Sequence, residues 1–116
     1  MEKLKVFTIE LLNIVTEAND IYLQKRKTKE KGDFYQEVKP FADRAREVCI
    51  QWQQEIGPFV QQGDFKYIHP PQVEAVVENI ELVSVQAFFP ETSYTRFKNY
   101  IESTSFLLDS LLNELG

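Results

Sequence analysis

Apolar residues along this chain of 116 residues recur at intervals of three and four, the spacing that places side chains on one face of an α-helix. Four segments show this spacing, and they run from Leu4 to Ile21, Val38 to Phe59, Val73 to Ala87 and Tyr94 to Leu115. The third segment is rich in valine, which favours strands, but its period is not two. The pattern therefore predicts four helices.

Residues that start and stop helices set the expected bounds of these segments. Asp33 is a good N-cap, and Gln36 follows three residues later, as in a capping box. Pro70 suits the first position of a helix, whereas Pro90 cannot continue one. We expect helices over residues of about 3–26, 33–62, 70–88 and 92–115.

Each predicted helix has one apolar stripe and a polar back, so it must bury the stripe against other helices. Short connections between long helices favour antiparallel neighbours. The sequence therefore predicts an all-α fold, an antiparallel up-down-up-down four-helix bundle that forms a single domain over residues 1–116. A helix of about 23 residues is roughly 35 Å long, so we expect an elongated molecule.

The charge and the cysteine content limit the environment and the partners. A net charge of −5 and a pI of about 4.9 disfavour binding to nucleic acid and to anionic membranes, which are themselves negative. The single cysteine cannot form a disulfide within the chain, and no run of 18 apolar residues is present. We expect an acidic cytoplasmic protein that is a monomer, with a dimer through the wide apolar stripe of the third helix as the alternative.

Few residues suggest chemistry. His69 is the only histidine, and a residue before proline is biased away from helical geometry, so we expect it to mark the start of the third helix. Cys49 lies beside an apolar seam and is expected to be buried and inert. A di-metal site in a bundle needs two Glu-x-x-His pairs, which one histidine cannot supply. We predict no catalytic residue, no metal ligand and no cofactor.

The run "KRKTKEK" at residues 25–31 has a net charge of +4, and the rest of the chain then carries −9. Lys25, Arg26 and Lys27 are candidate partner-binding residues, because such asymmetry suits an acidic protein surface or a nucleic acid. We expect a solvated loop between the first two helices. No aromatic residue interrupts the run to stack on bases, which argues against nucleic acid.

Aromatic residues are numerous enough to fill a core. We expect Trp52 to pack there together with Phe7, Phe41, Phe97 and Phe106, rather than to line a ligand pocket. Truncating Trp52 to alanine should then cost about 3–5 kcal/mol. Thr104 falls on the apolar seam of the fourth helix, where its hydroxyl can bond the carbonyl one turn back.

Three stretches resemble the YppE-like proteins of Gram-positive bacteria: "DFYQEVKPFADRA", "KYIHPPQVEAVVENI" and "RFKNYIESTSFLLDSL". The resemblance covers residues 33–115. Its most specific parts are Lys39-Pro40, Trp52, Lys66-Tyr67 with His69, and Arg96-Phe97-Lys98. It implies an all-helical four-helix bundle and no assigned activity.

Our leading hypothesis is a non-catalytic helical bundle that binds another protein. The candidate surface is the corner between the second and third helices, with Lys66, Tyr67 and His69, which the up-down topology places near both termini. One alternative is a nucleic-acid-associated factor that uses residues 25–31. Another is a protein that binds a small ligand or a metal.

Overall fold

Four α-helices and one short π-helix make up most of the chain in a computed structural model that describes all 116 residues. The elements are α1 (Glu2–Thr28), the π-helix η1 (Phe34–Val38), α2 (Lys39–Gln61), α3 (Pro70–Gln86) and α4 (Tyr94–Leu115). No strand is present, so the predicted all-α class is confirmed.

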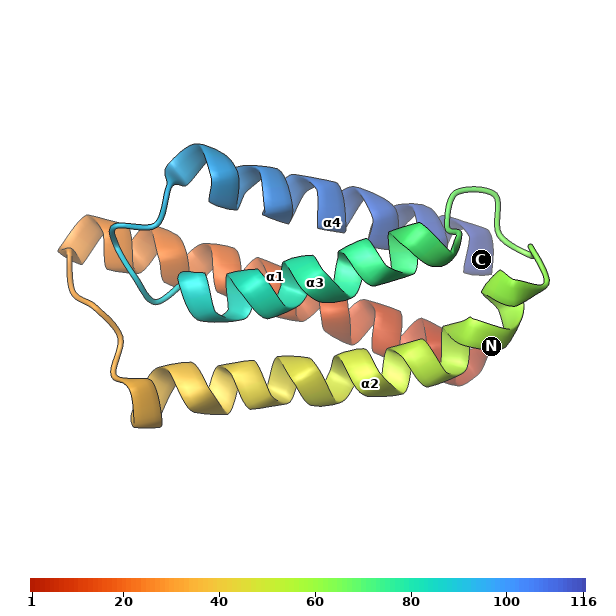
Figure 1. Ribbon diagram of the computed structural model, residues 1–116, viewed down its shortest axis with the longest axis horizontal. Coiled ribbons are helices and arrows are strands. Elements are labelled where there is room, and N and C mark those ends of the chain that lie inside the picture. Colours follow the sequence, from red (N-terminus) through yellow and green to blue (C-terminus); the bar gives the residue numbers. More distant parts are fainter.

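The helices run alternately in opposite directions along a common axis (Figure 1). Each helix packs on its neighbours in the order α1, α2, α3 and α4, α4 closes back onto α1, and α1 also contacts α3 across the bundle. The molecule measures 45 × 26 × 21 Å. The predicted antiparallel up-down-up-down bundle is therefore confirmed. The two termini and the α2–α3 link lie at one end, and the α1–α2 and α3–α4 links lie at the other.

The apolar stripes of all four helices meet in one core. Twenty-five buried apolar residues form a single cluster, with Trp52, Tyr22 and Phe97 as its largest fully buried members. Tyr22 and Phe97 stack with their ring centroids 4.2 Å apart, which joins α1 to α4. The predicted core position of Phe106 is wrong, because this side chain is 66% exposed on the outer face of α4.

Two of the buried polar side chains, Thr8 and Thr104, are paired across helices. The indole Nε1 of Trp52 donates a hydrogen bond of 3.0 Å to the hydroxyl of Thr8, which in turn donates to the carbonyl of Leu4. The Thr104 hydroxyl accepts a hydrogen bond of 3.2 Å from Nδ2 of Asn79. The predicted bond from Thr104 to its own helix is therefore replaced by one between α3 and α4, because a polar neighbour lies within reach on the facing helix.

Candidate functional site

The structure separates the predicted binding residues into two groups at opposite ends of the bundle. Lys25, Arg26 and Lys27 lie in the last turn of α1, whereas Lys66, Tyr67 and His69 lie in the α2–α3 link. These positions are at opposite ends of the long axis of the molecule in Figure 1. The two groups therefore cannot belong to one compact site.

The α2–α3 link is attached to the end of α4. The peptide N–H groups of Lys66 and Tyr67 both donate to the carboxylate of Glu114, over 2.6 and 3.2 Å. The Lys66 ammonium lies 5.3 Å from the centre of the Tyr67 ring, which is about half exposed. His69 is the N-cap residue of α3, and its N–H donates to Oε1 of Gln72 over 3.1 Å. These contacts stabilise the corner of the bundle.

The basic run is only partly the solvated loop that the sequence predicted, because residues 25–28 are helical and residues 29–31 lie in the exposed α1–α2 link. Helix α1 continues to Thr28 and ends at Lys29, whose φ of 62° is in the left-handed region. Lys25 Nζ contacts Oε1 of Glu37 at 2.8 Å, which ties the last turn of α1 to η1. This hydrogen bond from Lys25 is also the main reason why the pKa of Glu37 lies below its usual value.

Arg26 is held against two tyrosines at the same end of the bundle. Its guanidinium donates a hydrogen bond of 3.0 Å to the hydroxyl of Tyr22, which donates to the Thr92 carbonyl over 2.6 Å. The guanidinium carbon also lies 5.5 Å from the centre of the Tyr94 ring, within cation–π range. Arg26 therefore links α1 to the start of α4.

Two aromatic side chains point into solvent from η1. Phe34 is 56% exposed and Tyr35 is 78% exposed, and their rings meet edge to face with centroids 5.1 Å apart. Burying a large aromatic side chain is normally favourable. An adjacent exposed pair is therefore a candidate contact surface for a partner.

The π-helical turn explains why Phe34 is not buried. In a continuous α-helix, Phe34 would share the buried face of Phe41, which lies seven residues later. In η1, however, the N–H of Val38 donates to the carbonyl of Asp33, five residues back, over 3.1 Å. The extra residue in this turn changes the phase of the side chains, and such turns are frequent at functional sites.

The predicted capping box at Asp33 forms with a different partner. The Asp33 carboxylate accepts from the N–H of Gln36 over 2.8 Å, as expected. The N–H of Asp33, however, donates to the carboxylate of Glu37 rather than to Gln36, also over 2.8 Å. Because the turn of η1 is wider than an α-helical turn, the side chain of Glu37, four residues after Asp33, reaches the Asp33 N–H in place of Gln36, three residues after it.

We define the basic tip as residues 25–39 and 89–98, the segments that end, link or begin helices at this end of the bundle. It holds eight basic and four acidic side chains, a net charge of +4, whereas the rest of the chain holds five basic and fourteen acidic ones, a net charge of −9. Lys27, Lys29 and Lys31 are exposed and form no ion pair. The fold therefore produces a positive end on a negative protein.

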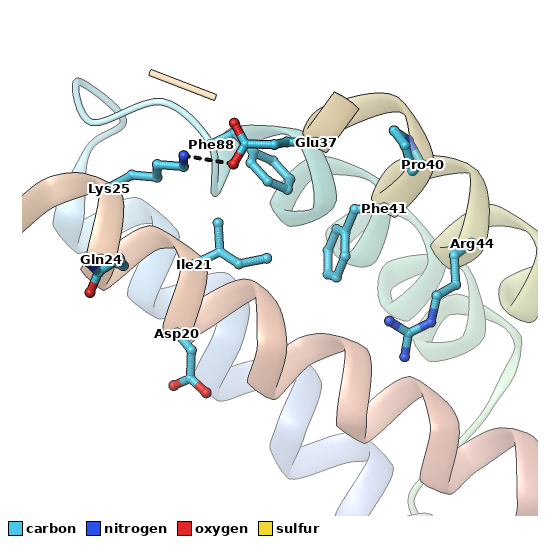
Figure 2. A pocket seen from close by; sticks show the side chains of 9 residues that line it. All are labelled: Asp20, Ile21, Gln24, Lys25, Glu37, Pro40, Phe41, Arg44 and Phe88. Atoms are coloured by element: carbon cyan, nitrogen blue, oxygen red, sulfur yellow. Dashed lines mark hydrogen bonds and ion pairs between the residues drawn. The ribbon is translucent and has the colours of Figure 1, made fainter. Parts of the chain in front are cut away.

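An open groove of about 740 Å³ lies between α1 and α2, beside the basic tip (Figure 2). Ile21, Phe41 and Phe88 supply its apolar surface. The rings of Phe41 and Phe88 meet edge to face with their centroids 5.8 Å apart. The groove has the size of a ligand site.

Two ion pairs join α1 to the opposite wall of this groove, one to η1 and one to α2. Lys25 pairs with Glu37 at the tip, as Figure 2 shows. Arg44 pairs with Glu17 at the other end, over 2.7 Å, and this hydrogen bond raises the pKa of the guanidinium. Both cations that line the groove are therefore already neutralised by a carboxylate.

The structure also places the thiol and the carboxylates that could take part in catalysis or metal binding. Cys49 is buried, and burial raises the pKa of its thiol to about 12. Glu74, Glu78 and Glu81 are exposed along α3. No group of three or more His, Cys, Asp or Glu side chains is placed to hold a metal ion. None of the helices is both long enough and apolar enough to cross a membrane.

Phe34 and Tyr35 are the candidate site residues that the sequence prediction missed. Their position directly after the N-cap Asp33 is visible in the sequence, but an α-helical periodicity places Phe34 in the core. The groove was missed for a similar reason, because the sequence does not give the distance between α1 and α2.

Comparison with known proteins bears on both the fold and the family. A protein of unknown function from Listeria innocua is 25% identical, and its structure superposes with a TM-score of 0.91 over 97% of this chain and 90% of that one. The crystal structure of YppE from Bacillus subtilis gives a TM-score of 0.90, at 23% identity, over 98% of this chain and 93% of YppE. A Staphylococcus aureus protein also gives 0.90, at 20% identity, over 97% of this chain and 96% of that one.

Sequence comparison leads to the same group of proteins. The uncharacterised protein YppE of Bacillus subtilis is 23% identical over 109 residues, which cover 94% of this chain and 89% of YppE. The profile of a bacterial domain of unknown function, DUF1798, matches residues 8–115. The resemblance to YppE-like proteins is thus confirmed, and the chain belongs to the DUF1798 family.

Proposed function

We propose that this protein is a non-catalytic binding module of the cytoplasm that holds a partner protein with an acidic surface at its basic tip. The observation that carries the proposal is the exposed pair Phe34 and Tyr35 in η1, at the same end of the bundle as the unpaired lysines and directly after the link that holds Lys29 and Lys31. Aromatic side chains that fill pockets of a partner supply much of the affinity in protein interfaces, and complementary charges select the partner.

The surface is preorganised, which supports a role in binding. Three contacts fix the segment that carries the aromatic pair: Gly32 to Phe88, Glu37 to Lys25 and the Asp33 cap. A surface that is ordered before binding loses less conformational entropy when the partner arrives. The aromatic pair is therefore held outward by the fold itself.

The negative charge of the whole protein does not oppose an acidic partner at this end. Charges in solution are screened beyond about 8 Å at physiological ionic strength, and the molecule is 45 Å long. A partner at the basic tip therefore interacts mainly with the local charge of +4. We propose that the protein acts there as a monomer, with one tip for each partner.

Site-specific photo-crosslinking in the native host tests this proposal. Benzoylphenylalanine is introduced at Tyr35, with Phe106 as a control because it is also an exposed aromatic residue, on the outer face of α4. We expect one partner protein to crosslink at residue 35 and not at residue 106. The yield should fall when Lys27, Lys29 and Lys31 are changed to glutamate.

Crosslinking at Tyr67 tests the α2–α3 corner, which the sequence prediction favoured. Tyr67 is about half exposed, next to Lys66. A partner that crosslinks at residue 67 and not at residue 35 would place the interface at that corner and refute the tip. If no protein crosslinks at residue 35, binding of a partner at the basic tip would also be refuted.

The alternative function is binding of single-stranded nucleic acid. The fold brings Phe34, Tyr35 and Tyr94 next to the basic run, and exposed rings beside lysines suit base stacking. Salt-dependent retention on immobilised single-stranded RNA, lost when Lys25, Arg26, Lys27 and Lys29 are neutralised, would favour this alternative. A retention that these changes leave unaltered would exclude it.

A further inference from the structure

We infer that the groove between α1 and α2 receives one bulky apolar side chain of the partner, from a peptide segment whose acidic residues lie on the side toward the basic tip. This inference rests on the proposed function and adds the chemical nature of the bound segment. It follows from the length of the groove, from its internal charge balance and from the unpaired lysines next to it.

The two ion pairs limit the length of what the groove can hold. Glu17 and Lys25 are eight residues apart on α1, which corresponds to about 12 Å along the helix axis. Ile21 lies midway between them and, in Figure 2, points toward Phe41. The space between the ion pairs therefore suits a single large side chain, not a long helix laid along the surface.

The charges inside the groove favour an uncharged occupant. Lys25 and Arg44 are each paired with a glutamate, so a charged group of the partner would have to displace one of these carboxylates. Asp20, the remaining charged residue of the lining, is directed away from Ile21 and Phe41 in Figure 2. The contact surface that remains is apolar, and burying it is favourable.

The charges outside the groove differ between its two ends. Beyond the Lys25–Glu37 pair lies the basic tip, where Lys27, Lys29 and Lys31 are free. Beyond the Arg44–Glu17 pair, the next charged residues are Glu10 on α1 and the adjacent Arg46 and Glu47 on α2, so this end carries no excess of positive charge. A segment with its apolar side chain in the groove therefore gains more from acidic residues on the tip side than on the other side.

Selection from a random peptide library displayed on phage tests the inference without a known partner. We expect the selected peptides to share one bulky apolar residue with acidic residues on one side of it. The best peptide is then synthesised, and its Kd is measured by fluorescence anisotropy at several salt concentrations. Peptides without such a pattern, or with basic residues around the apolar one, would overturn the inference.

Two variants of the same helix separate the groove from the rest of the surface. Ile21→Trp fills the groove and should weaken binding of the selected peptide at least tenfold. Ile9→Trp makes the same change at an exposed position of α1 outside the groove and should alter the Kd less than twofold. Equal Kd values for the two variants would overturn the groove as the binding site.

Methyl NMR of the unmodified protein checks the result independently of how Ile21→Trp folds. Addition of the selected peptide should shift the δ1 methyl signal of Ile21 and leave that of Ile9 in place. Changing Lys27, Lys29 and Lys31 to glutamate should weaken binding and reduce its salt dependence. If only the lysine changes have no effect, binding at the basic tip is refuted and binding in the groove is supported. If only the change at Ile21 has no effect, binding in the groove is refuted and binding at the basic tip is supported.

A second copy of the chain is the competing occupant. Phe106 is exposed between Glu102 and Asp109 on the polar face of α4, so it has part of the chemistry that the groove would select. Sedimentation equilibrium distinguishes this case. A dimer that Phe106→Ala and Ile21→Trp each dissociate would overturn the inference in favour of self-association, and a monomer supports binding of a different protein.

Discussion

The peptide N–H of Gly32 donates a hydrogen bond of 2.8 Å to the carbonyl of Phe88, which joins the α1–α2 link to the end of α3. The two residues are in such close contact that a Cβ atom on Gly32 would lie 2.8 Å from the Cβ of Phe88. Because Phe88 also forms the floor of the groove, this contact connects the basic tip to the core.

Replacing Gly32 with alanine should therefore destabilise the protein. The Cβ atom of Phe88 is fixed by its backbone, so the link must move away, and overpacking of this kind costs roughly 1–3 kcal/mol. Urea unfolding followed by circular dichroism measures the effect. Gly57→Ala is the matched control, because nothing apart from its chain neighbours lies within 4 Å of its new Cβ inside α2. Its effect should be less than about 1 kcal/mol, because the gain in helix propensity from alanine is offset by contact of the new Cβ with the ring of the following Pro58. Equal effects at the two positions would refute the close contact at Gly32.

A second prediction concerns the hydrogen bond between Trp52 and Thr8 in the core. Thr8→Val keeps the shape of the side chain and leaves the buried indole N–H without an acceptor, which should cost about 1–3 kcal/mol. Trp52→Phe removes the donor, whereas the Thr8 hydroxyl keeps its bond to the Leu4 carbonyl. In the double variant, Thr8→Val should therefore cost less than it does alone. Strictly additive free energies of unfolding would show that the two groups do not interact.

The sequence was sufficient for the fold, because every helix repeats its apolar residues at a regular spacing. Buried positions such as Leu4, Trp52, Ile80 and Leu108 lie on the predicted seams or adjoin them. Phe106 was placed wrongly because it is apolar in composition but lies opposite the seam of α4. Helical phase, rather than hydrophobicity alone, decided which aromatic residues are buried.

The candidate site was much less predictable. Lys25, Arg26 and Lys27 were recognised from their charge, but the order of Lys25 and Arg26 depends on contacts with Glu37 and Thr92, which are distant in the sequence. The exposure of Phe34 depends on a π-helical turn that periodicity does not reveal. The groove depends on the distance between two helices, which large side chains such as Phe88 determine only when the chain is folded.

Cys49 provides a third prediction. Burial raises the pKa of its thiol to about 12, and the negative charge of Glu81 acts in the same direction. Since the thiolate is the reactive form, the native protein should not react with Ellman's reagent at pH 8, and the unfolded protein should react fully. The variant Cys49→Ser with Ile50→Cys moves the thiol to an exposed neighbouring position and should react in the native state. Rapid, complete reaction of Cys49 in the native protein would contradict its burial.

The ion pair between Lys25 and Glu37 gives the stability a dependence on pH. The Glu37 carboxylate accepts hydrogen bonds from Lys25 and from the Asp33 N–H, and these bonds hold the pKa of Glu37 below its usual value. A carboxyl group with a lowered pKa in the folded state stabilises that state fully above the pKa of the unfolded chain, which is about 4.3 for Glu. This contribution is lost as the pH falls through the lowered folded-state pKa. The pair therefore strengthens the join between α1 and η1 at neutral pH and not in strong acid.

Glu37→Gln should accordingly lower the Tm at pH 7, and the difference from the unmodified protein should disappear in acid. A double-mutant cycle with Lys25→Met should give a coupling of roughly 0.2–1 kcal/mol at pH 7, the usual range for partly exposed ion pairs. Asp43→Asn is the control, because Asp43 and Lys39 form an ion pair in which both side chains are more than half exposed. Its effect should be smaller and should leave the α1–η1 contact intact. If the difference in Tm between Glu37→Gln and the unmodified protein stayed constant from pH 7 down to pH values near 2, the Glu37 carboxylate could not be the group that joins η1 to α1.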